Sequence, residues 1–167
     1  AHRSRFQRWH WGRLMRKEYP KLNGIIAVSE GVREDLLTTT GMPADRITAI
    51  KNPVTTAEMI REAQTSVDHP WLSENFGEPV LITVGRLTKN KDHKTLLEAF
   101  RLINDTIPSR LLILGEGPER TSLEKIITET GLADRVQLPG FVDTPWAWMA
   151  KSSLFVLSSF AEGSGNV

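Results

Sequence analysis

The feature of this sequence that most restricts its fold is a regular alternation of short apolar runs and helical patterns after residue 79. The runs VLITV, LLIL, VQL and LFVL occupy residues 80–84, 111–114, 136–138 and 154–157. Helical patterns lie between them, at residues 92–107, after residue 119, and at residues 145–150. This alternation predicts βαβ units, and therefore an α/β fold with a parallel sheet that binds ligands at the carboxyl ends of its strands.

The helix expected at residues 92–107 carries its apolar residues at helical spacing. They form a face that should pack on the sheet, made of Leu96, Leu97, Phe100, Ile103 and Ile107.

The first part of the chain follows the same pattern less regularly. Residues 2–19 predict a basic helix, and the apolar runs at 25–28 and 47–50 predict strands. Ser29 and Gly41 bracket a further helix, since Ser is a good N-cap and Gly commonly ends a helix. Residues 53–78 lack sustained periodicity, which indicates a connector with a short helix near 57–63.

Composition excludes several classes of protein. The 167 residues contain no cysteine, so a disulfide scaffold and a thiolate metal site are excluded, and a cytoplasmic location is expected. The longest apolar runs are strand-sized and far shorter than a membrane-spanning helix. The four histidines show no metal-ligand spacing, and the chain has no D-x-D pair, no G-x-S-x-G sequence and no Walker sequence. We therefore expect neither a metal ion nor a serine nucleophile.

The net charge of +1 conceals an asymmetry along the chain. Residues 1–23 hold seven Lys or Arg and one acid, so the other 14 basic and 19 acidic residues give the rest of the chain a charge of −5. Trp9 and Trp11 lie in the same basic opening. Such a split indicates either an arm that contacts nucleic acid or a membrane surface, or a piece of a larger protein.

The stretch VGRLTKNKDHKTLLEAF, residues 84–100, is the first that carries chemistry. Gly85 follows a predicted parallel strand, and Arg86 and Lys91 lie in the loop before the next helix. Helix N-termini bind phosphates at such a place, and a planar Arg with a mobile Lys suits a diphosphate. The alternative is a solvated basic loop, because Lys89 and Lys94 lie nearby.

Two further loops follow predicted strands. In GEGPER, Gly115 and Gly117 are expected to be structural, because they allow the turn and the third glycine of a dinucleotide fingerprint is missing. After the next strand, Gly140 and Phe141 form a loop against which a flat base could lie.

The last stretch, SSFAEGSGNV, places Glu162 after a strand, followed by Gly163 and Gly165. A carboxylate there can bind sugar hydroxyls, while backbone N–H groups face a phosphate. The alternative is an N-capping acid in a glycine loop.

These stretches, in the order VSEGV, NPV, VGRL-K-KD, GEGPER, PGFVD and SS-EG-GNV, resemble the retaining glycosyltransferases of family 4 from about residue 24 to the end. The resemblance implies the GT-B architecture, in which two Rossmann-like domains with parallel sheets and flanking helices face each other. It implies that residues 1–52 are the end of the N-terminal, acceptor-side domain, 53–78 the interdomain linker, and 79–167 an incomplete donor-binding domain. We therefore expect the chain to be part of a longer protein and to have no transferase activity by itself.

The resemblance also assigns roles to residues. Arg86 and Lys91 would bind the donor diphosphate, Glu162 would touch the transferred sugar, and all three would be catalytic. The full set implied for donor binding is Gly85, Arg86, Lys91, Gly140, Phe141, Val142, Glu162, Gly163, Ser164, Gly165, Asn166 and Val167.

The function implied is transfer of a sugar, with retention, from a UDP- or GDP-linked donor to a lipid-linked or polysaccharide acceptor. The nucleotide-sugar would be a co-substrate, with no metal or further cofactor. No nucleic-acid partner is expected, and the basic N-terminal segment would contact the inner face of the membrane peripherally. The alternative is a non-catalytic module that binds a phosphorylated ligand or nucleotide.

Overall fold

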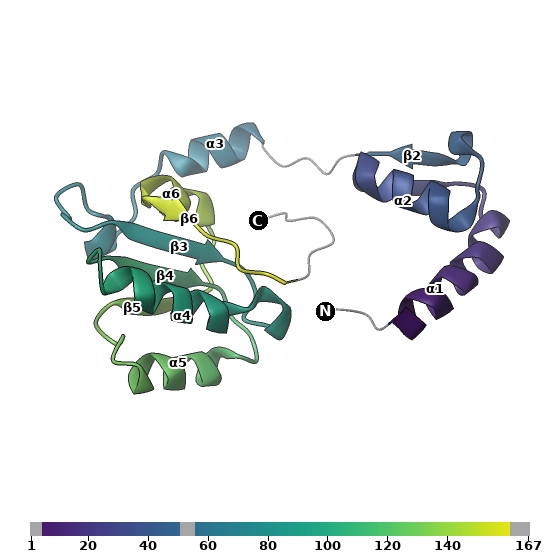
Figure 1. The fold of residues 1–167 in the computed structure, drawn as a ribbon. Helices are drawn as coiled ribbons and strands as arrows, with labels where there is room; N and C mark the ends of the chain where they lie inside the picture. The colour runs from purple at the N-terminus through teal and green to yellow at the C-terminus, as the bar shows by residue number, and fades with distance from the viewer. Residues whose placement is uncertain (1–4, 51–55, 161–167) are drawn as a thin grey trace. The chain divides into compact units, whose positions relative to one another are not determined.

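The computed structural model describes residues 5–50 and 56–160, which form two compact units (Figure 1). The assignment of the chain to an acceptor-side part, a linker and a donor-binding part stays a prediction.

The first unit contains two short parallel strands and two helices. Helix α1 (Arg5–Glu18) precedes strand β1 (Ile25–Ala27), and helix α2 (Glu30–Thr40) connects it to strand β2 (Ile47–Ala49). The Ser29 hydroxyl accepts a hydrogen bond from the Val32 N–H at 3.2 Å, and Gly41 ends α2 in the left-handed conformation. Both helix boundaries predicted from the sequence are therefore confirmed. A small core packs between these elements, made of Ala27, Leu36, Met42 and Ile47.

The second unit is built around a four-stranded parallel sheet in the order β5-β4-β3-β6. Its strands are β3 (Val80–Val84), β4 (Arg110–Leu114), β5 (Val136–Gly140) and β6 (Leu154–Phe155). Its helices are α3 (Ala57–Ala63), α4 (His93–Asn104), α5 (Arg120–Glu129) and α6 (Pro145–Lys151). The predicted α/β class with a parallel sheet is confirmed.

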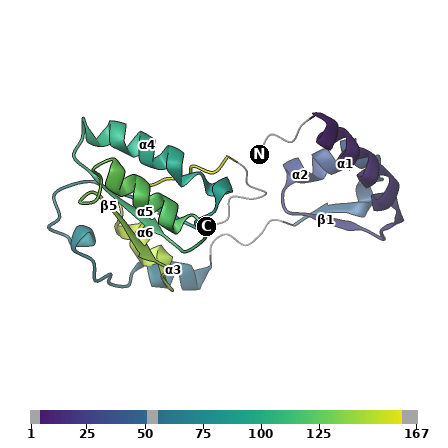
Figure 2. The same ribbon diagram turned by 90° about the horizontal axis from the view of Figure 1, so that it is seen from below.

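Helices cover both faces of this sheet, as Figures 1 and 2 show. Alternate strand residues point to opposite faces. Leu81 and Leu111 face α4 and α5 in one core cluster, whereas Ile82 and Leu112 face α6 and the segment around Trp71 in the other. Helix α3 packs against α6. Both faces are buried along the central strands β3 and β4, which explains why these two contain continuous apolar runs.

Two expectations about these elements are wrong. Ile103 and Ile107 were assigned to the core face of α4, but they are 42% and 53% exposed. The helix ends at Asn104, so Ile107 is not part of it. Ile103 lies in the last turn of the helix, beyond the residues that pack on the sheet. Strand β6 is also shorter than the predicted 154–157, because only Leu154 and Phe155 pair with β3.

Candidate functional site

The ends of three neighbouring strands meet through glycines at the carboxyl edge of the sheet. The Gly85 N–H donates a hydrogen bond to the Leu114 carbonyl at 3.0 Å, and the Gly115 N–H donates one to the Gly140 carbonyl at 2.7 Å. A Cβ atom on Gly115 would lie 2.0 Å from the Gly85 carbonyl oxygen, closer than atoms can approach. Only glycine at position 115 lets the loops after β3, β4 and β5 come together here.

The loop after β3 is fixed by Leu87, which is fully buried. Its N–H donates to the Glu116 carbonyl at 2.9 Å, and its carbonyl accepts from the Glu119 N–H at 3.0 Å. Both bonds join this loop to the GEGPER loop after β4. Arg86, next to this anchor, is exposed at the edge, and no carboxylate among the described residues pairs with it. The loop therefore presents an exposed guanidinium to a ligand at this strand end.

Lys91 comes to the same strand end from the 3-10 turn η4 (Lys89–Lys91). Its side chain lies over Gly85: a Cβ atom built on Gly85 would be 3.3 Å from Lys91 Cε and 3.6 Å from Nζ. The Ser158 hydroxyl donates to the Lys91 carbonyl at 2.8 Å, and the Phe160 N–H donates to the Asn90 carbonyl at 3.1 Å. The segment after β6 thereby holds the turn that carries Lys91.

A cavity of about 410 Å³ opens beside these cations. It is lined by Val84, Gly85, Arg86, Leu114, Gly115, Glu116, Phe141, Val142 and Pro145. Most of these residues are apolar, and Phe141 is 75% exposed. A mostly apolar cavity with a few charged groups is typical of a small-molecule site. The cavity could hold a ligand with a flat ring against its apolar wall and an anionic group in contact with Arg86.

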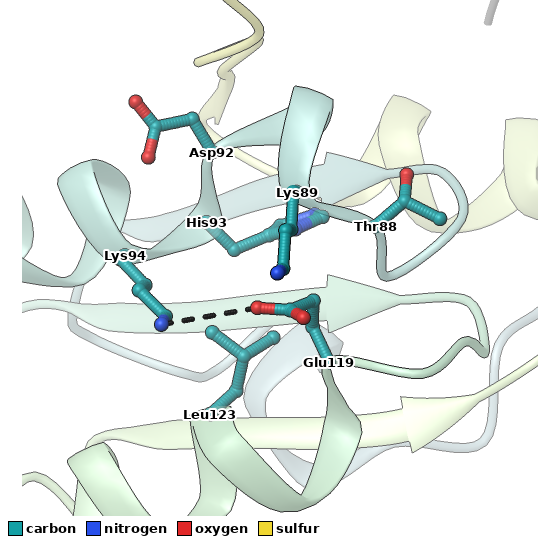
Figure 3. A pocket seen from close by; sticks show the side chains of 7 residues that line it. All are labelled: Thr88, Lys89, Asp92, His93, Lys94, Glu119 and Leu123. Atoms are coloured by element: carbon teal, nitrogen blue, oxygen red, sulfur yellow. Dashed lines mark ion pairs between the residues drawn. The ribbon is translucent and has the colours of Figure 1, made fainter.

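A second, smaller cavity of about 130 Å³ lies behind the Lys91 turn and is lined by Lys89, His93, Lys94 and Glu119 among others (Figure 3). His93 is only 3% exposed, and its Nδ1 atom has no hydrogen-bond partner among the residues that the structure describes. Burial lowers the pKa of His93, the Lys91 charge lowers it further, and Asp92 raises it. Lys94 pairs with Glu119 at 3.8 Å across this cavity. Burial and the nearby Lys91 charge therefore both favour the neutral form of the His93 side chain.

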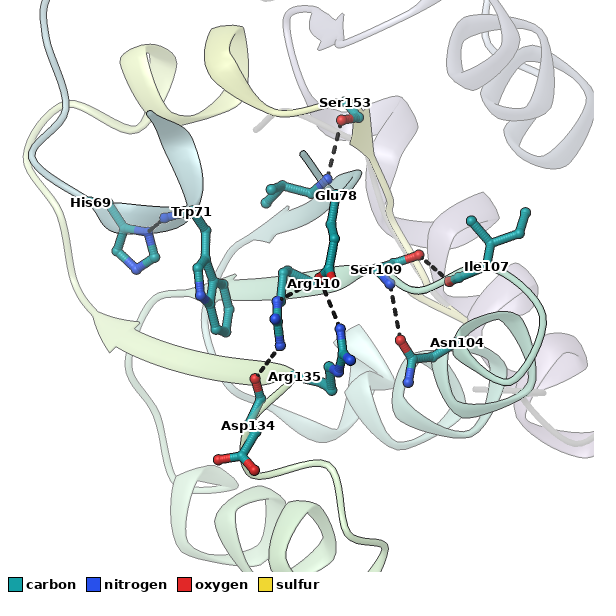
Figure 4. Close-up of polar contacts among 11 residues, drawn as sticks. His69, Trp71, Glu78, Asn104, Ile107, Ser109, Arg110, Asp134, Arg135 and Ser153 are labelled. Carbon is teal, nitrogen blue, oxygen red and sulfur yellow. Dashed lines mark hydrogen bonds and ion pairs between the residues drawn. The ribbon is translucent and has the colours of Figure 1, made fainter. Parts of the chain in front are cut away.

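A polar cluster at the opposite, amino edge of the sheet has a structural role (Figure 4). Glu78 Oε2 lies 2.8 Å from both Arg110 Nε and Arg135 Nη1. The contact with Arg135 is a hydrogen bond, whereas that with Arg110 is an ion pair without hydrogen-bond geometry. The Arg110 guanidinium also lies over the Trp71 ring, 5.3 Å from its centre. These contacts tie the segment before β3 to β4 and β5, far along the strands from Arg86.

The structure brings together some of the residues implied by the resemblance and leaves others outside its description. Gly85, Arg86, Phe141 and Val142 line the larger cavity, and Lys91 lies against Gly85. Gly140 is buried at the end of β5 and is not among the described lining residues. The remaining predicted site residues lie outside the described residues: Glu162, Gly163, Ser164, Gly165, Asn166 and Val167.

Sequence reasoning missed Glu116, which lines the larger cavity. A signal was present, because Glu116 follows a predicted strand just as Arg86 does. Among the described residues, no three His, Asp or Glu side chains gather in a way that could hold a metal ion.

The fold is that of known glycosyltransferase structures. TarM of S. aureus, solved in complex with UDP among other ligands, superposes with a TM-score of 0.72 and 24% identity over 92% of this chain and 28% of that chain. HepE of Anabaena, in complex with UDP and glucose, gives a TM-score of 0.69 and 21% identity over 92% of this chain and 43% of that chain. The GT-B neighbours confirm the predicted Rossmann-like fold class.

Curated relatives are also glycosyltransferases. N-acetylgalactosamine-N,N'-diacetylbacillosaminyl-diphospho-undecaprenol 4-alpha-N-acetylgalactosaminyltransferase of Campylobacter jejuni is 31% identical over 149 residues, 89% of this chain. The lipopolysaccharide core biosynthesis glycosyltransferase LpsE of Rhizobium meliloti is 34% identical over 102 residues, 61% of this chain. The chain spans 38% of the length of the first relative and 29% of the second.

Two family patterns match this chain. Residues 1–58 match Glycosyltransferase Family 4. Residues 68–167, more than half of the chain, match Glycosyl transferases group 1. Together with the strand-end cations and the fold, these matches show that the chain belongs to the glycosyl transferases of group 1.

Proposed function

We propose that this chain carries the donor-binding part of a glycosyltransferase that takes its sugar from a UDP- or GDP-linked donor. The observation that carries the proposal is the exposed Arg86 beside the apolar cavity, with Lys91 directed to the same strand end. A nucleoside diphosphate matches this arrangement, because it joins a flat base, whose ring faces can lie against apolar side chains, to an anionic diphosphate. TarM and HepE are both described in complex with UDP.

The two cations fit the chemistry of the donor. When the bond between the sugar and the diphosphate breaks, positive charge develops on the sugar ring and negative charge on the departing diphosphate. Arg86 and Lys91 would stabilise that negative charge, because the loop after β3 brings both cations to this strand end. Two cations beside the leaving group make a metal ion unnecessary for this step. Glu162 would contact the transferred sugar.

The acceptor we propose is lipid-linked or a polysaccharide, with retention at the transferred sugar. The Campylobacter relative acts on a diphospho-undecaprenol acceptor, and the Rhizobium relative acts in lipopolysaccharide core biosynthesis. Retention follows from the family resemblance. NMR spectroscopy of the product made by the full-length protein identifies the anomer and so tests whether the configuration is retained.

Titration calorimetry with UDP and GDP tests the donor site. Arg86→Ala and Lys91→Ala should each weaken binding of the preferred nucleotide by about ten-fold to a hundred-fold, since each removes a charged hydrogen-bond donor. Lys89→Ala is the matched control, because Lys89 lies in the same loop but lines the smaller cavity. Unchanged binding in both variants would contradict the proposal. Binding without sugar transfer by the full-length protein would favour the alternative, a non-catalytic nucleotide-binding module.

We also propose a peripheral membrane contact through helix α1, on the cytoplasmic side. Trp11 and Leu14 are 48% and 42% exposed, and Arg13 and Lys17 are exposed on the same helix. Exposed apolar and basic side chains on one helix suit an anionic lipid surface. Within the described residues, no helix combines the length and apolar character needed to span a membrane. Sedimentation with anionic vesicles tests the contact: the double variant Arg13→Glu and Lys17→Glu should lose it.

A further inference from the structure

The larger cavity has two charged side chains among its described lining residues, Arg86 and Glu116. The proposed function uses Arg86 for the diphosphate. Among the described lining residues, Glu116 is then the remaining charged side chain, and it could distinguish one nucleobase from another. A carboxylate repels phosphate, so it should not face the diphosphate.

The Glu116 carboxylate is held in place at the cavity wall. Arg120 Nη1 donates to Glu116 Oε1 at 2.6 Å, while Arg120 Nε bonds Glu124 at 2.8 Å and Nη2 bonds the Leu138 carbonyl at 2.9 Å. Arg120 therefore has three fixed partners from α5, β5 and the loop after β4. Within the described residues, Oε2 of Glu116 has no hydrogen-bond donor.

Gly140 makes room for this carboxylate. A Cβ atom on Gly140 would lie 2.9 Å from Glu116 Oε1, so any other residue there would push the carboxylate away. Gly140 also precedes Phe141, whose exposed ring lines the same cavity. The loop predicted to receive the base thus contributes the flat apolar ring of Phe141. The small size of Gly140 allows the Glu116 carboxylate to lie beside this loop.

We propose that Glu116 is a specificity-determining residue, which accepts a hydrogen bond from a ring N–H of the donor's nucleobase; this rests on the proposed function. An ionised carboxylate only accepts hydrogen bonds, so it selects a ligand edge that donates. Uracil and guanine each carry a ring N–H, whereas cytosine and adenine carry an acceptor nitrogen at the corresponding place. The carboxylate therefore favours UDP or GDP donors.

The test compares UDP with its N3-methyl analogue, which lacks the ring N–H, by titration calorimetry. The unsubstituted chain should bind the analogue about ten-fold or more weakly, as expected for the loss of a hydrogen bond to a charged group. Glu116→Ala should bind both nucleotides with similar affinity. Glu116→Gln keeps the shape of the side chain but removes its charge, and should retain a smaller preference.

Glu124→Gln is the matched control. It removes another carboxylate partner of the same Arg120 but does not line the cavity, so it should keep the full preference for UDP. If N3-methylation weakens binding equally with and without the Glu116 carboxylate, the inference is wrong. If removal of the ribose hydroxyl, in 2′-deoxy-UDP, weakens binding and N3-methylation does not, the carboxylate contacts the ribose. That result would also overturn the inference. If the unsubstituted chain binds no nucleotide at all, the proposed function itself fails.

Discussion

Single residues decide whether the loops at the carboxyl edge of the sheet can meet. Gly115 and Gly117 were expected to be structural because they allow a turn, and this is their role, but the reason is more specific. A Cβ atom at Gly115 would collide with the Gly85 carbonyl oxygen, and one at Gly117 would lie 2.5 Å from the Leu87 carbonyl oxygen. The two glycines let one loop pack on the backbone of another, and this packing positions Arg86.

We expect Gly115→Ala to destabilise the fold by about 3 kcal/mol or more, because it combines overpacking against backbone with a positive φ of 129°. Urea unfolding measures the change. Gly77→Ala is the control, since nothing lies within 4 Å of a Cβ atom there, and it should change stability by less than about 0.5 kcal/mol. Equal effects of the two substitutions would show that the close approach at Gly115 is unimportant.

His93 should make stability depend on pH. Its folded pKa lies below its ordinary value because of burial and the Lys91 charge. The unfolded chain therefore takes up a proton near pH 6.5 that the folded chain binds only at lower pH. The stabilisation from neutral His93 is present above about pH 6.5 and is lost as the pH falls below it.

Urea unfolding at pH 7.5 and 5.5 tests this dependence. His93→Gln should lose less stability than the unsubstituted protein when the pH is lowered. His10→Gln, at an exposed histidine of the first unit, should behave like the unsubstituted protein. An unchanged pH dependence in His93→Gln would contradict the expectation.

At the scale of elements, the segment after β6 and the turn η4 act together. Ser158 and Phe160 hydrogen-bond the carbonyls of Lys91 and Asn90. The same segment leads to Glu162, which the family resemblance places against the transferred sugar. The Lys91 turn is therefore supported by the segment after β6, which precedes the proposed sugar-binding loop.

We expect Ser158→Ala to weaken UDP or GDP binding several-fold, because it frees the turn that carries Lys91, while stability changes by about 1 kcal/mol. Titration calorimetry and urea unfolding measure the two effects. Ser153→Ala is the control: the Ser153 hydroxyl accepts from the Val80 N–H at 3.1 Å at the other end of β6. It should change stability without changing affinity. Equal affinity losses in both variants would mean that Ser158 acts only through the fold.

At the scale of the whole molecule, the two units differ in how much apolar surface they bury. The first unit has two strands of three residues each and a small core, whereas the second has two core clusters on either side of its sheet. Stability within a chain follows local burial, so small units open more readily.

Hydrogen exchange should therefore be uneven along the chain. We expect amides of β1 and β2 to exchange at least about a hundred-fold faster than those of β3 and β4, after correction for intrinsic rates. Mass spectrometry of peptides from each unit measures this. Equal protection in both units would mean that they open as one cooperative body.

The sequence by itself determined the class of fold, the positions of most elements and the placement of two cations at one edge of the sheet. Apolar periodicity and capping residues such as Ser29 and Gly41 are local signals, so they can be recognised without the fold. Arg86 was found because it follows a strand, and parallel strands place their carboxyl ends together.

Only the tertiary structure decided which residues meet at that edge. It placed Gly140 behind Glu116, brought Lys91 over Gly85, and left Ile103 and Ile107 exposed. These arrangements join residues far apart in the sequence, as for Gly140 and Glu116, or depend on how a loop folds back and on where a helix ends. Their outcome follows from packing between elements, which no local pattern encodes.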